Sequence, residues 1–122
     1  MANDFKRFTV SSVNTSVGAS ASTVYTVPAG AGSTALESIV IGITLANKTS
    51  SGVTASVFLD NYTGSNDVYI VKDATIPAGS SLEVMSGNKI VLQNSGSAGD
   101  VLRVSSNTAT SIDATISVLE DV

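Results

Sequence analysis

The run Ile39-Val40-Ile41-Gly42-Ile43-Thr44-Leu45 is the most apolar stretch of the chain and among the richest in β-branched residues. Its length matches one buried strand, and the stretch at 46–52 that follows is rich in the Ser, Thr and Gly of a turn. We therefore expect this run to be a buried strand around which the other strands pack. A glycine inside a strand marks either a β-bulge or a close approach of neighbouring atoms. For Gly42 the sequence favours dense packing against a bulky neighbour.

The next stretch alternates between apolar and other residues with a period of two. Val53, Ala55, Val57 and Leu59 would lie on one face of a strand, which is the pattern of a half-buried strand. No long segment combines a helical period with helix-forming residues. The sequence thus predicts an all-β fold, a single antiparallel β-sandwich of about eight strands. The other strands are expected at 5–10, 23–27, 35–45, 68–71, 82–85, 89–93, 101–104 and 114–119.

Two parts of the chain resemble each other. Thr26-Val27-Pro28-Ala29-Gly30 recurs as Thr75-Ile76-Pro77-Ala78-Gly79, and each copy is followed by Leu-Glu and later by Leu-x-Asn. Pro presets φ for a turn, and Gly accepts the positive φ that a type II turn needs. Two similar halves favour a double Greek key, which is a jelly-roll-like layout. The alternative is that Val-Pro-Ala-Gly is simply a good turn used twice.

The first residues are small and polar, with few large apolar side chains. We interpret residues 1–22 as an extended N-terminal arm and residues 23–122 as the β-sandwich domain. Residues 5–10 could be either a first strand or a docking arm. An arm of this composition would be mobile alone and would become ordered on binding.

Composition indicates how the core and the surface are built. Apolar residues make up 43% of the 122 residues, but aromatic residues only 5%, with no Trp, so Val, Ile, Leu and Ala must form the core. Charged residues are 13%, about half the usual share. The surface is therefore mostly short hydroxyl side chains, which lose little entropy when they are buried. This favours a chain that functions in an assembly, although a solvated Ser/Thr-rich surface has the same composition.

Several function classes are disfavoured by the residues that the chain lacks. It has no Cys and no His, which excludes disulfides, thiolate nucleophiles and zinc–thiolate sites and removes the commonest general base. The net charge is −4 and the basic residues are scattered, whereas a nucleic-acid binder needs a basic stripe. No apolar run approaches the ~20 residues that span a membrane, and the start lacks an apolar signal-peptide core. We expect a soluble protein made in the cytoplasm, with no cofactor and no catalytic or metal site.

The carboxylates do not form an obvious pair. Most Asp residues are predicted in turns or at strand ends, where Asp commonly caps its own backbone, so a paired-acid hydrolase is disfavoured; they are Asp60, Asp67, Asp73, Asp100 and Asp113. Asp60, Asn61, Asn66 and Asp67 could offer oxygen ligands to calcium, but their spacing is not that of an EF-hand. A polar connector is the preferred interpretation.

The remaining polar motifs are weak. The glycosylation triplets at Asn14, Asn47 and Asn61 are interpreted as chance matches in a Ser/Thr-rich chain. Tyr25, Tyr62 and Tyr69 are expected to cover sheet edges and sheet ends. Tyr62, in a loop, is the one candidate for a contact residue.

The order of several segments resembles that of small virion structural proteins of tailed bacteriophages, particularly those that infect cyanobacteria. The matching segments cover almost the whole chain and are a pattern of strands and turns without a catalytic signature; they are 5–7, 23–30, 41–49, 71–79 and 102–106 through 116–120. The resemblance implies a β-sandwich protein built into a virion.

From this resemblance we expect a non-enzymatic capsid decoration or cement protein. Such a protein binds between major capsid subunits, and we favour a trimer that docks through its N-terminal arm by strand addition. Two alternatives remain. One is a tail, neck or fibre-attachment module of the same virion, and the other is a receptor- or glycan-binding head.

Overall fold

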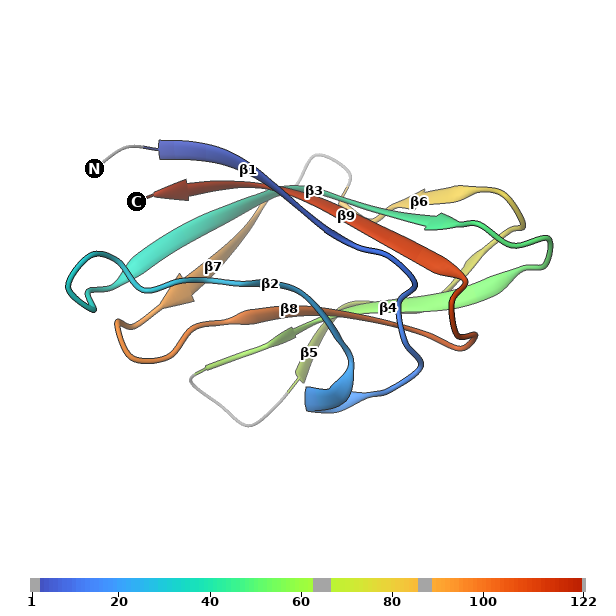
Figure 1. The fold of residues 1–122 in the computed structure, drawn as a ribbon, viewed down its shortest axis with the longest axis horizontal. Coiled ribbons are helices and arrows are strands. Elements are labelled where there is room, and N and C mark those ends of the chain that lie inside the picture. Colours follow the sequence, from blue (N-terminus) through green and yellow to red (C-terminus); the bar gives the residue numbers. More distant parts are fainter. Residues whose placement is uncertain (1–2, 63–66, 86–88, 122) are drawn as a thin grey trace.

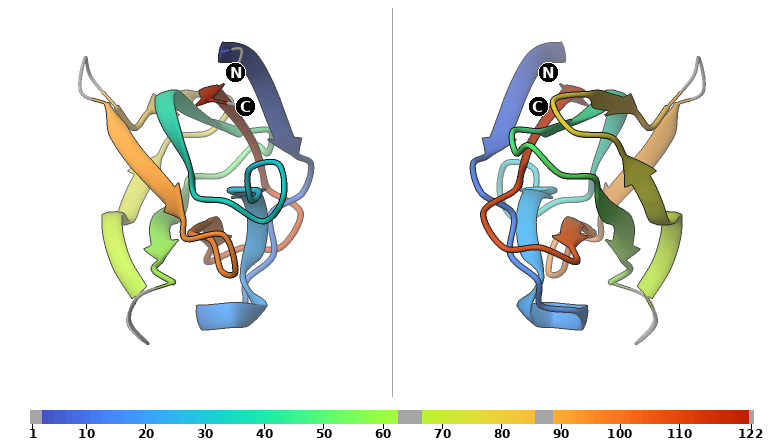
Figure 2. Two further views of the ribbon diagram at one scale, coloured as in Figure 1. Left: turned by 90° about the vertical axis from the view of Figure 1, so that its left-hand side faces the viewer. Right: turned by 90° about the vertical axis from the view of Figure 1, so that its right-hand side faces the viewer.

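Two antiparallel sheets packed face to face make up the chain in a computed structural model that describes residues 3–62, 67–85 and 89–121 (Figures 1 and 2). The predicted all-β sandwich is confirmed. A single 3-10 turn, η1 (Gly18–Ser20), lies between the first two strands. The strands are β1 (Asn3–Val10), β2 (Ser22–Thr26), β3 (Leu36–Asn47), β4 (Val53–Asp60), β5 (Asp67–Ile76), β6 (Ser81–Glu83), β7 (Ile90–Asn94), β8 (Val101–Ser106) and β9 (Ile112–Asp121).

The strand order is that of a jelly roll. Sheet A has the order β1-β9-β3-β6, with β7 also paired to β3, and sheet B has the order β2-β8-β4-β5. β6 and β7 pair with successive parts of the same edge of β3, so they act as one interrupted strand. β1 pairs with β9 and β2 pairs with β8, and the same nesting continues inward to the β4–β5 hairpin. This is a long hairpin rolled into two sheets, which is the jelly-roll arrangement.

The strand β3 is the organising strand, as the sequence predicts. It pairs with β9, β6 and β7, and Val40, Ile43 and Leu45 on it are fully buried. The inward positions change from even to odd numbers because the register with β9 shifts between Val40 and Gly42. The dense packing expected around Gly42 is therefore wrong. A Cβ there would meet only the Glu83 Oε1 atom, at an ordinary 3.5 Å, and the glycine belongs to a β-bulge.

The core between the sheets is aliphatic, as the composition predicts. Its fully buried side chains come from both sheets and include Ile43, Leu92, Leu102 and Ile116. Tyr25 is the main aromatic contribution, and its ring centroid lies 4.6 Å from that of Phe8. Small branched side chains of this kind suit two closely stacked sheets.

The arm predicted over residues 1–22 is wrong for the part that the structure describes. β1 pairs with β9 in unbroken register from Asn3 to Val10, and Val13, which follows it, is fully buried in the core. The period of two was obscured because Phe5 faces solvent while Phe8 packs against the core. Residues 3–22 are thus part of the sandwich.

The internal resemblance is a structural repeat. Both Pro-Ala-Gly copies lie where the chain crosses from sheet B to sheet A. Asn47 Nδ2 donates to the carbonyl of Ile76 at 3.0 Å, and Asn94 Nδ2 donates to the carbonyl of Val27 at 2.7 Å. Each asparagine Oδ1 also accepts a hydrogen bond from the backbone N–H two residues ahead. Each half of the chain therefore holds the residue that precedes the proline of the other half.

The two Pro-Ala-Gly turns nevertheless differ. At the second copy Gly79 takes the predicted positive φ, which is +65°. The N–H of Ser80 donates to the carbonyl of Pro77 at 3.1 Å, so Pro77 precedes the two central residues, and the expectation that it presets φ at the first of them is wrong. At the first copy the chain reverses later, between Gly30 and Thr34, where Gly32 and Ser33 take positive φ values of +70° and +59°.

Candidate functional site

An apolar row crosses the outer face of sheet A. Phe5 lies opposite Leu119, Leu119 opposite Ile39, and Ile39 opposite Val91 in the strand registers. Phe5 is 79% exposed and Val91 54% exposed, and the two are joined across the sheet by the half-buried pair between them. We call these four residues, with Ile41 beside them, the apolar row.

Polar side chains flank the apolar row. Two positions further along β1 and β9, Arg7 lies opposite Ser117. Beyond these residues Thr9, Thr115 and Thr44 lie opposite one another across three strands. The outer face of sheet A is thus apolar at the end near the two termini and hydroxyl-bearing at the other end.

Ile41 joins the apolar row because of the bulge in β3. The sequence predicts a strand buried throughout, yet Ile41 is 39% exposed and Ile39 is only half-buried. A bulge places two residues of one strand opposite one residue of its partner, which changes the direction of the side chains beside it. The high apolar content of the run therefore indicates one face in the core and another apolar face outside it.

A buried polar network holds β1 at the same end of the sandwich. Glu120 is 2% exposed. Its Oε1 accepts from Lys6 Nζ at 2.8 Å, and its Oε2 accepts from the Tyr25 hydroxyl at 2.5 Å. That hydroxyl also lies 2.7 Å from Ser38 Oγ. The network joins residues of both sheets and ties the edge strand that carries Phe5.

The electrostatics of this network favour a charged carboxylate. Burial raises the pKa of Glu120. The hydrogen bonds from Lys6 and Tyr25, together with the charge of Lys6, lower it by more, so the pKa of Glu120 lies below its ordinary value. Burial, followed by the hydrogen bond to Glu120, raises the pKa of Tyr25 well above its ordinary value. The phenol therefore remains protonated and donates to the carboxylate.

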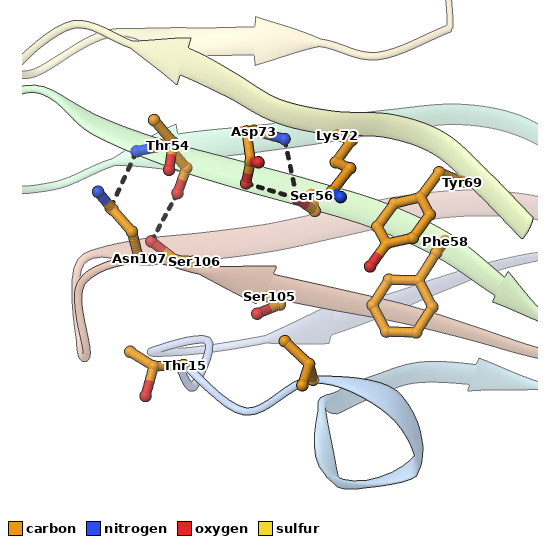
Figure 3. A pocket seen from close by; sticks show the side chains of 11 residues that line it. Thr15, Thr54, Ser56, Phe58, Tyr69, Lys72, Asp73, Ser105, Ser106 and Asn107 are labelled. Carbon is orange, nitrogen blue, oxygen red and sulfur yellow. Dashed lines mark hydrogen bonds between the residues drawn. The ribbon is translucent and has the colours of Figure 1, made fainter. Parts of the chain in front are cut away.

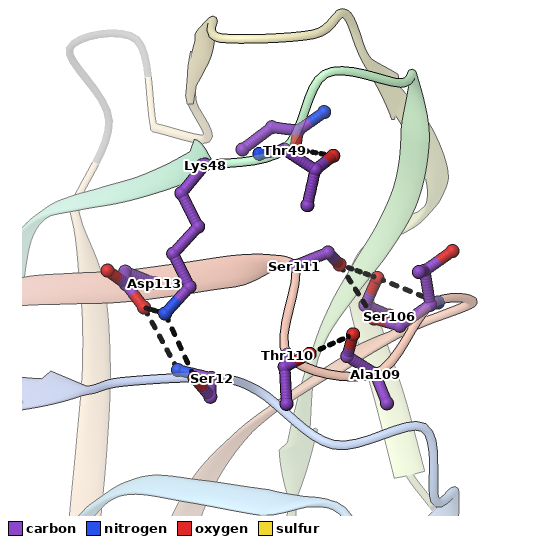
Figure 4. A network of polar contacts seen from close by, with 10 residues as sticks. Ser12, Lys48, Thr49, Ser106, Ala109, Thr110, Ser111 and Asp113 are labelled. Atoms are coloured by element: carbon purple, nitrogen blue, oxygen red, sulfur yellow. Dashed lines mark hydrogen bonds and ion pairs between the residues drawn. The ribbon is translucent and has the colours of Figure 1, made fainter.

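Two of the acidic residues at turns and strand ends fasten segments that are distant in sequence. Asp113 Oδ1 accepts from Lys48 Nζ at 2.8 Å and from the backbone N–H of Ser12 at 2.9 Å (Figure 4). Asp100, which is buried, accepts from the backbone N–H groups of Tyr62 and Gln93. The expected capping of their own backbone is wrong for these two residues. Their bonds link loops and strands to one another.

The calcium candidates are partly engaged elsewhere. Asp60 Oδ2 accepts from Arg103 Nε at 3.2 Å, and Asp67 lies opposite Asp60 in the β4–β5 register. Asn66 lies outside the described residues. Over residues 3–62, 67–85 and 89–121, no group of three or more acidic side chains is placed to hold a metal ion.

The predicted tyrosine positions are only partly correct. Tyr25 belongs to an edge strand, yet it is 3% exposed and points into the core, so the expectation that it covers an edge is wrong. Tyr69 lies on the edge strand β5 and is 42% exposed, as expected. Tyr62 is half-buried after β4. Asn47, the asparagine of one of the three glycosylation triplets, is buried, and its Nδ2 donates to the carbonyl of Ile76.

No protein-family model, curated protein sequence or solved structure matches the chain. None of the described residues belongs to a helix long and apolar enough to cross a membrane.

Proposed function

We propose that this chain is a non-enzymatic virion structural protein of a tailed bacteriophage, a capsid decoration protein that stabilises the head by binding between major capsid subunits. The pattern of segments that resembles such proteins supports the proposal, as does the jelly-roll topology, an architecture that viral capsid domains commonly use.

The observation that carries the proposal is the apolar row. Phe5 and Val91 are large apolar side chains exposed on the same face of sheet A, and contiguous exposed apolar groups mark interaction sites. Beyond Arg7 and Ser117 the same face carries short hydroxyl side chains, which cost little entropy to immobilise, and Glu37 and Gln93 lie on the other side of the row. A face of this kind favours a permanent partner such as the capsid shell.

Docking then occurs through a preformed face. The sequence predicts docking by strand addition through a free arm. Among the described residues no such arm is present, because residues 3–22 belong to the sandwich. In the proposed mechanism the outer face of sheet A is buried against neighbouring capsid subunits. The stabilisation is the apolar area removed from water, at about 25 cal/mol per Å².

The proposal is tested by the stoichiometry of the chain in purified phage particles, measured by quantitative mass spectrometry against the major capsid protein. A ratio near one to one, or a simple fraction of it, supports decoration of the head. A ratio of a few per cent instead places the chain in a tail, neck or fibre-attachment module. Absence from the particle overturns the virion assignment.

The assembly state is a separate part of the proposal. We propose a homo-oligomer, with a trimer as the first expectation, because three copies around a symmetry axis can contact adjoining capsid subunits together. Sedimentation velocity of the purified chain measures this directly. A monomer at all concentrations would mean that the copies meet only on the particle.

A further inference from the structure

A groove of about 420 Å³ lies on the outer face of sheet B (Figure 3). The apolar row lies on the outer face of the other sheet. Its floor is formed by β4 and β8, one wall by β5, and the other wall by the loop that contains Thr15 and Val17. Volumes of this size are typical of sites for small molecules.

Irregular pairing in the edge strand β5 forms one wall. The β4–β5 register shifts on either side of Val57, so that Ser56 faces two residues of β5, Lys72 and Asp73. Asp73 has a φ of +50°, and its backbone N–H donates to Ser56 Oγ at 2.9 Å. Bulges of this kind re-aim side chains and are frequent beside binding sites.

An aromatic pair closes one end of the groove. The Tyr69 and Phe58 ring centroids are 5.2 Å apart, with the rings tilted by 39°. Phe58 is almost completely buried, whereas Tyr69 is 42% exposed. Lys72 Nζ lies 5.3 Å from the Tyr69 ring centroid, within the range of a cation–π contact. The Tyr69 ring is thus held in place by neighbours while part of it stays open to solvent.

The groove also carries hydrogen-bonding groups that the described residues leave unused. Ser105 is 7% exposed, its side chain lies in the groove, and no contact among the described residues engages its hydroxyl (Figure 3). Asn107 Oδ1 accepts from the backbone N–H of Thr54 at 3.0 Å and from the Thr108 hydroxyl, and no described contact uses its Nδ2 group. No buried side-chain N or O atom among the described residues lacks a partner, so the Ser105 hydroxyl keeps access to solvent in the groove and is available to a ligand.

We propose that this groove binds a sugar ring of an uncharged polysaccharide or glycan. The apolar C–H face of a sugar packs against an aromatic ring, and its hydroxyls need partners that both donate and accept. Ser105 supplies a hydroxyl, Asn107 an amide and Asp73 a carboxylate. One cation and one carboxylate line the groove, in Lys72 and Asp73, so their charges offset each other and favour an uncharged ligand.

A polypeptide strand is the other occupant that an open sheet edge could take. Two register shifts interrupt the β5 ladder, and bulges and lysines at an edge disfavour pairing with a further strand. The Ser105 hydroxyl and the Asn107 side chain also lie away from the β5 edge (Figure 3). The geometry therefore favours the sugar.

The test is an NMR titration of the isolated, isotope-labelled chain with glucose, galactose, mannose and N-acetylglucosamine, followed by a screen against surface polysaccharides. At least one sugar is expected to shift the amide signals of β4, β5 and β8 around Ser56 and Ser105. Tyr69→Ala should weaken binding at least about tenfold, since it removes the aromatic wall. Val68→Ser, at the exposed neighbouring residue, is the matched control and should leave the affinity unchanged.

Ser105→Ala is the second variant, because it removes one hydroxyl without disturbing the aromatic pair. It should weaken binding about threefold to tenfold, the effect of one hydrogen bond. The proposal is overturned if no sugar shifts these signals, if shifts occur only elsewhere, or if both variants bind as tightly as the wild type. It is also overturned if extended peptides shift the β5 edge while sugars do not. None of these outcomes depends on a phage particle, so the result is independent of the proposed virion function.

Discussion

The two outer faces of the sandwich differ in shape and in chemistry. The face of sheet A carries the apolar row, with Phe5 and Val91 exposed on it. The face of sheet B carries a groove lined by hydroxyls, an amide and an aromatic pair. We propose that the first face is buried against a protein partner and the second is open to a small ligand.

The location of the bulges accounts for much of the difference. In sheet A the register shift lies between two inner strands, at Gly42 of β3, so the neighbouring strands stay aligned and the face carries a continuous row. In sheet B the shifts between β4 and β5 lie at the edge of the sheet, where Tyr69 and Asp73 line one side of the groove. The first irregularity thus adds Ile41 to the apolar row, and the second forms a wall of the groove.

The largest expected effect comes from removing the carboxylate that holds β1 under the apolar row. Glu120→Ala leaves the buried Tyr25 hydroxyl and Lys6 without their acceptor and should lower the free energy of unfolding by about 2–3 kcal/mol. Urea denaturation measures it. Glu37→Ala, at an exposed carboxylate on β3, is the control and should change stability by less than about 0.5 kcal/mol. Equal effects would mean that the network does not hold β1.

Acid should remove part of the same contribution. The pKa of Glu120 is lowered in the folded state from its ordinary 4.5, so its stabilisation is present above that value and is lost as the pH falls through the folded-state pKa. Denaturation midpoints measured from pH 7 downward should therefore fall below about pH 4.5 in the wild type. Glu120→Gln should be less stable at pH 7 and show a flatter acid limb. Parallel pH profiles for the two proteins would contradict this assignment.

Docking to the particle should depend on the apolar row and tolerate changes on the other sheet. Phe5→Ser combined with Val91→Ser should reduce binding to capsids that lack the chain by about tenfold or more, because each lost side chain would otherwise be buried. Co-sedimentation with the capsids measures this. Val68→Ser, which removes a 51%-exposed valine from sheet B, should bind as the wild type does. Unchanged binding by the double variant would break the proposed link between this face and the capsid.

The sequence was sufficient for the architecture because strand patterns and turn residues are local signals. The alternation at Val53–Leu59 and the repeated Pro-Ala-Gly predicted sheets and a jelly roll, and both are confirmed. The structural role of the Leu-x-Asn part of the repeat could not be predicted, because it depends on contacts between the two halves of the fold. Asn47 and Asn94 each bind a carbonyl in the other half of the chain.

The two surfaces were not predictable, because each depends on pairing between distant strands. Phe5 joins the apolar row only through the β1–β9 register, and its spacing from Phe8 suggested an irregular arm. The groove needs β5 to continue past Val71 to Ile76 with two register shifts. An unbound hydroxyl such as that of Ser105 is indistinguishable in sequence from the many other serines.

The smallest expected effect tests whether Gly42 is required by the bulge or by close packing. Its φ is not in the left-handed region, and a Cβ would meet only Glu83 Oε1 at 3.5 Å. Gly42→Ala should therefore be tolerated and should stabilise the protein by about 0.5 kcal/mol, because alanine reduces the entropy of the unfolded chain. Thermal and urea denaturation measure this change.

The matched control is Gly32→Ala, at a position with equally open surroundings but a φ of +70°. Its backbone strain should cost about 1 kcal/mol, so the two glycines should respond with opposite signs. A loss of more than about 1 kcal/mol at Gly42 would restore the close-packing interpretation. The exposure of Ile41 in the apolar row would then follow from the packing of its neighbours and not from the bulge.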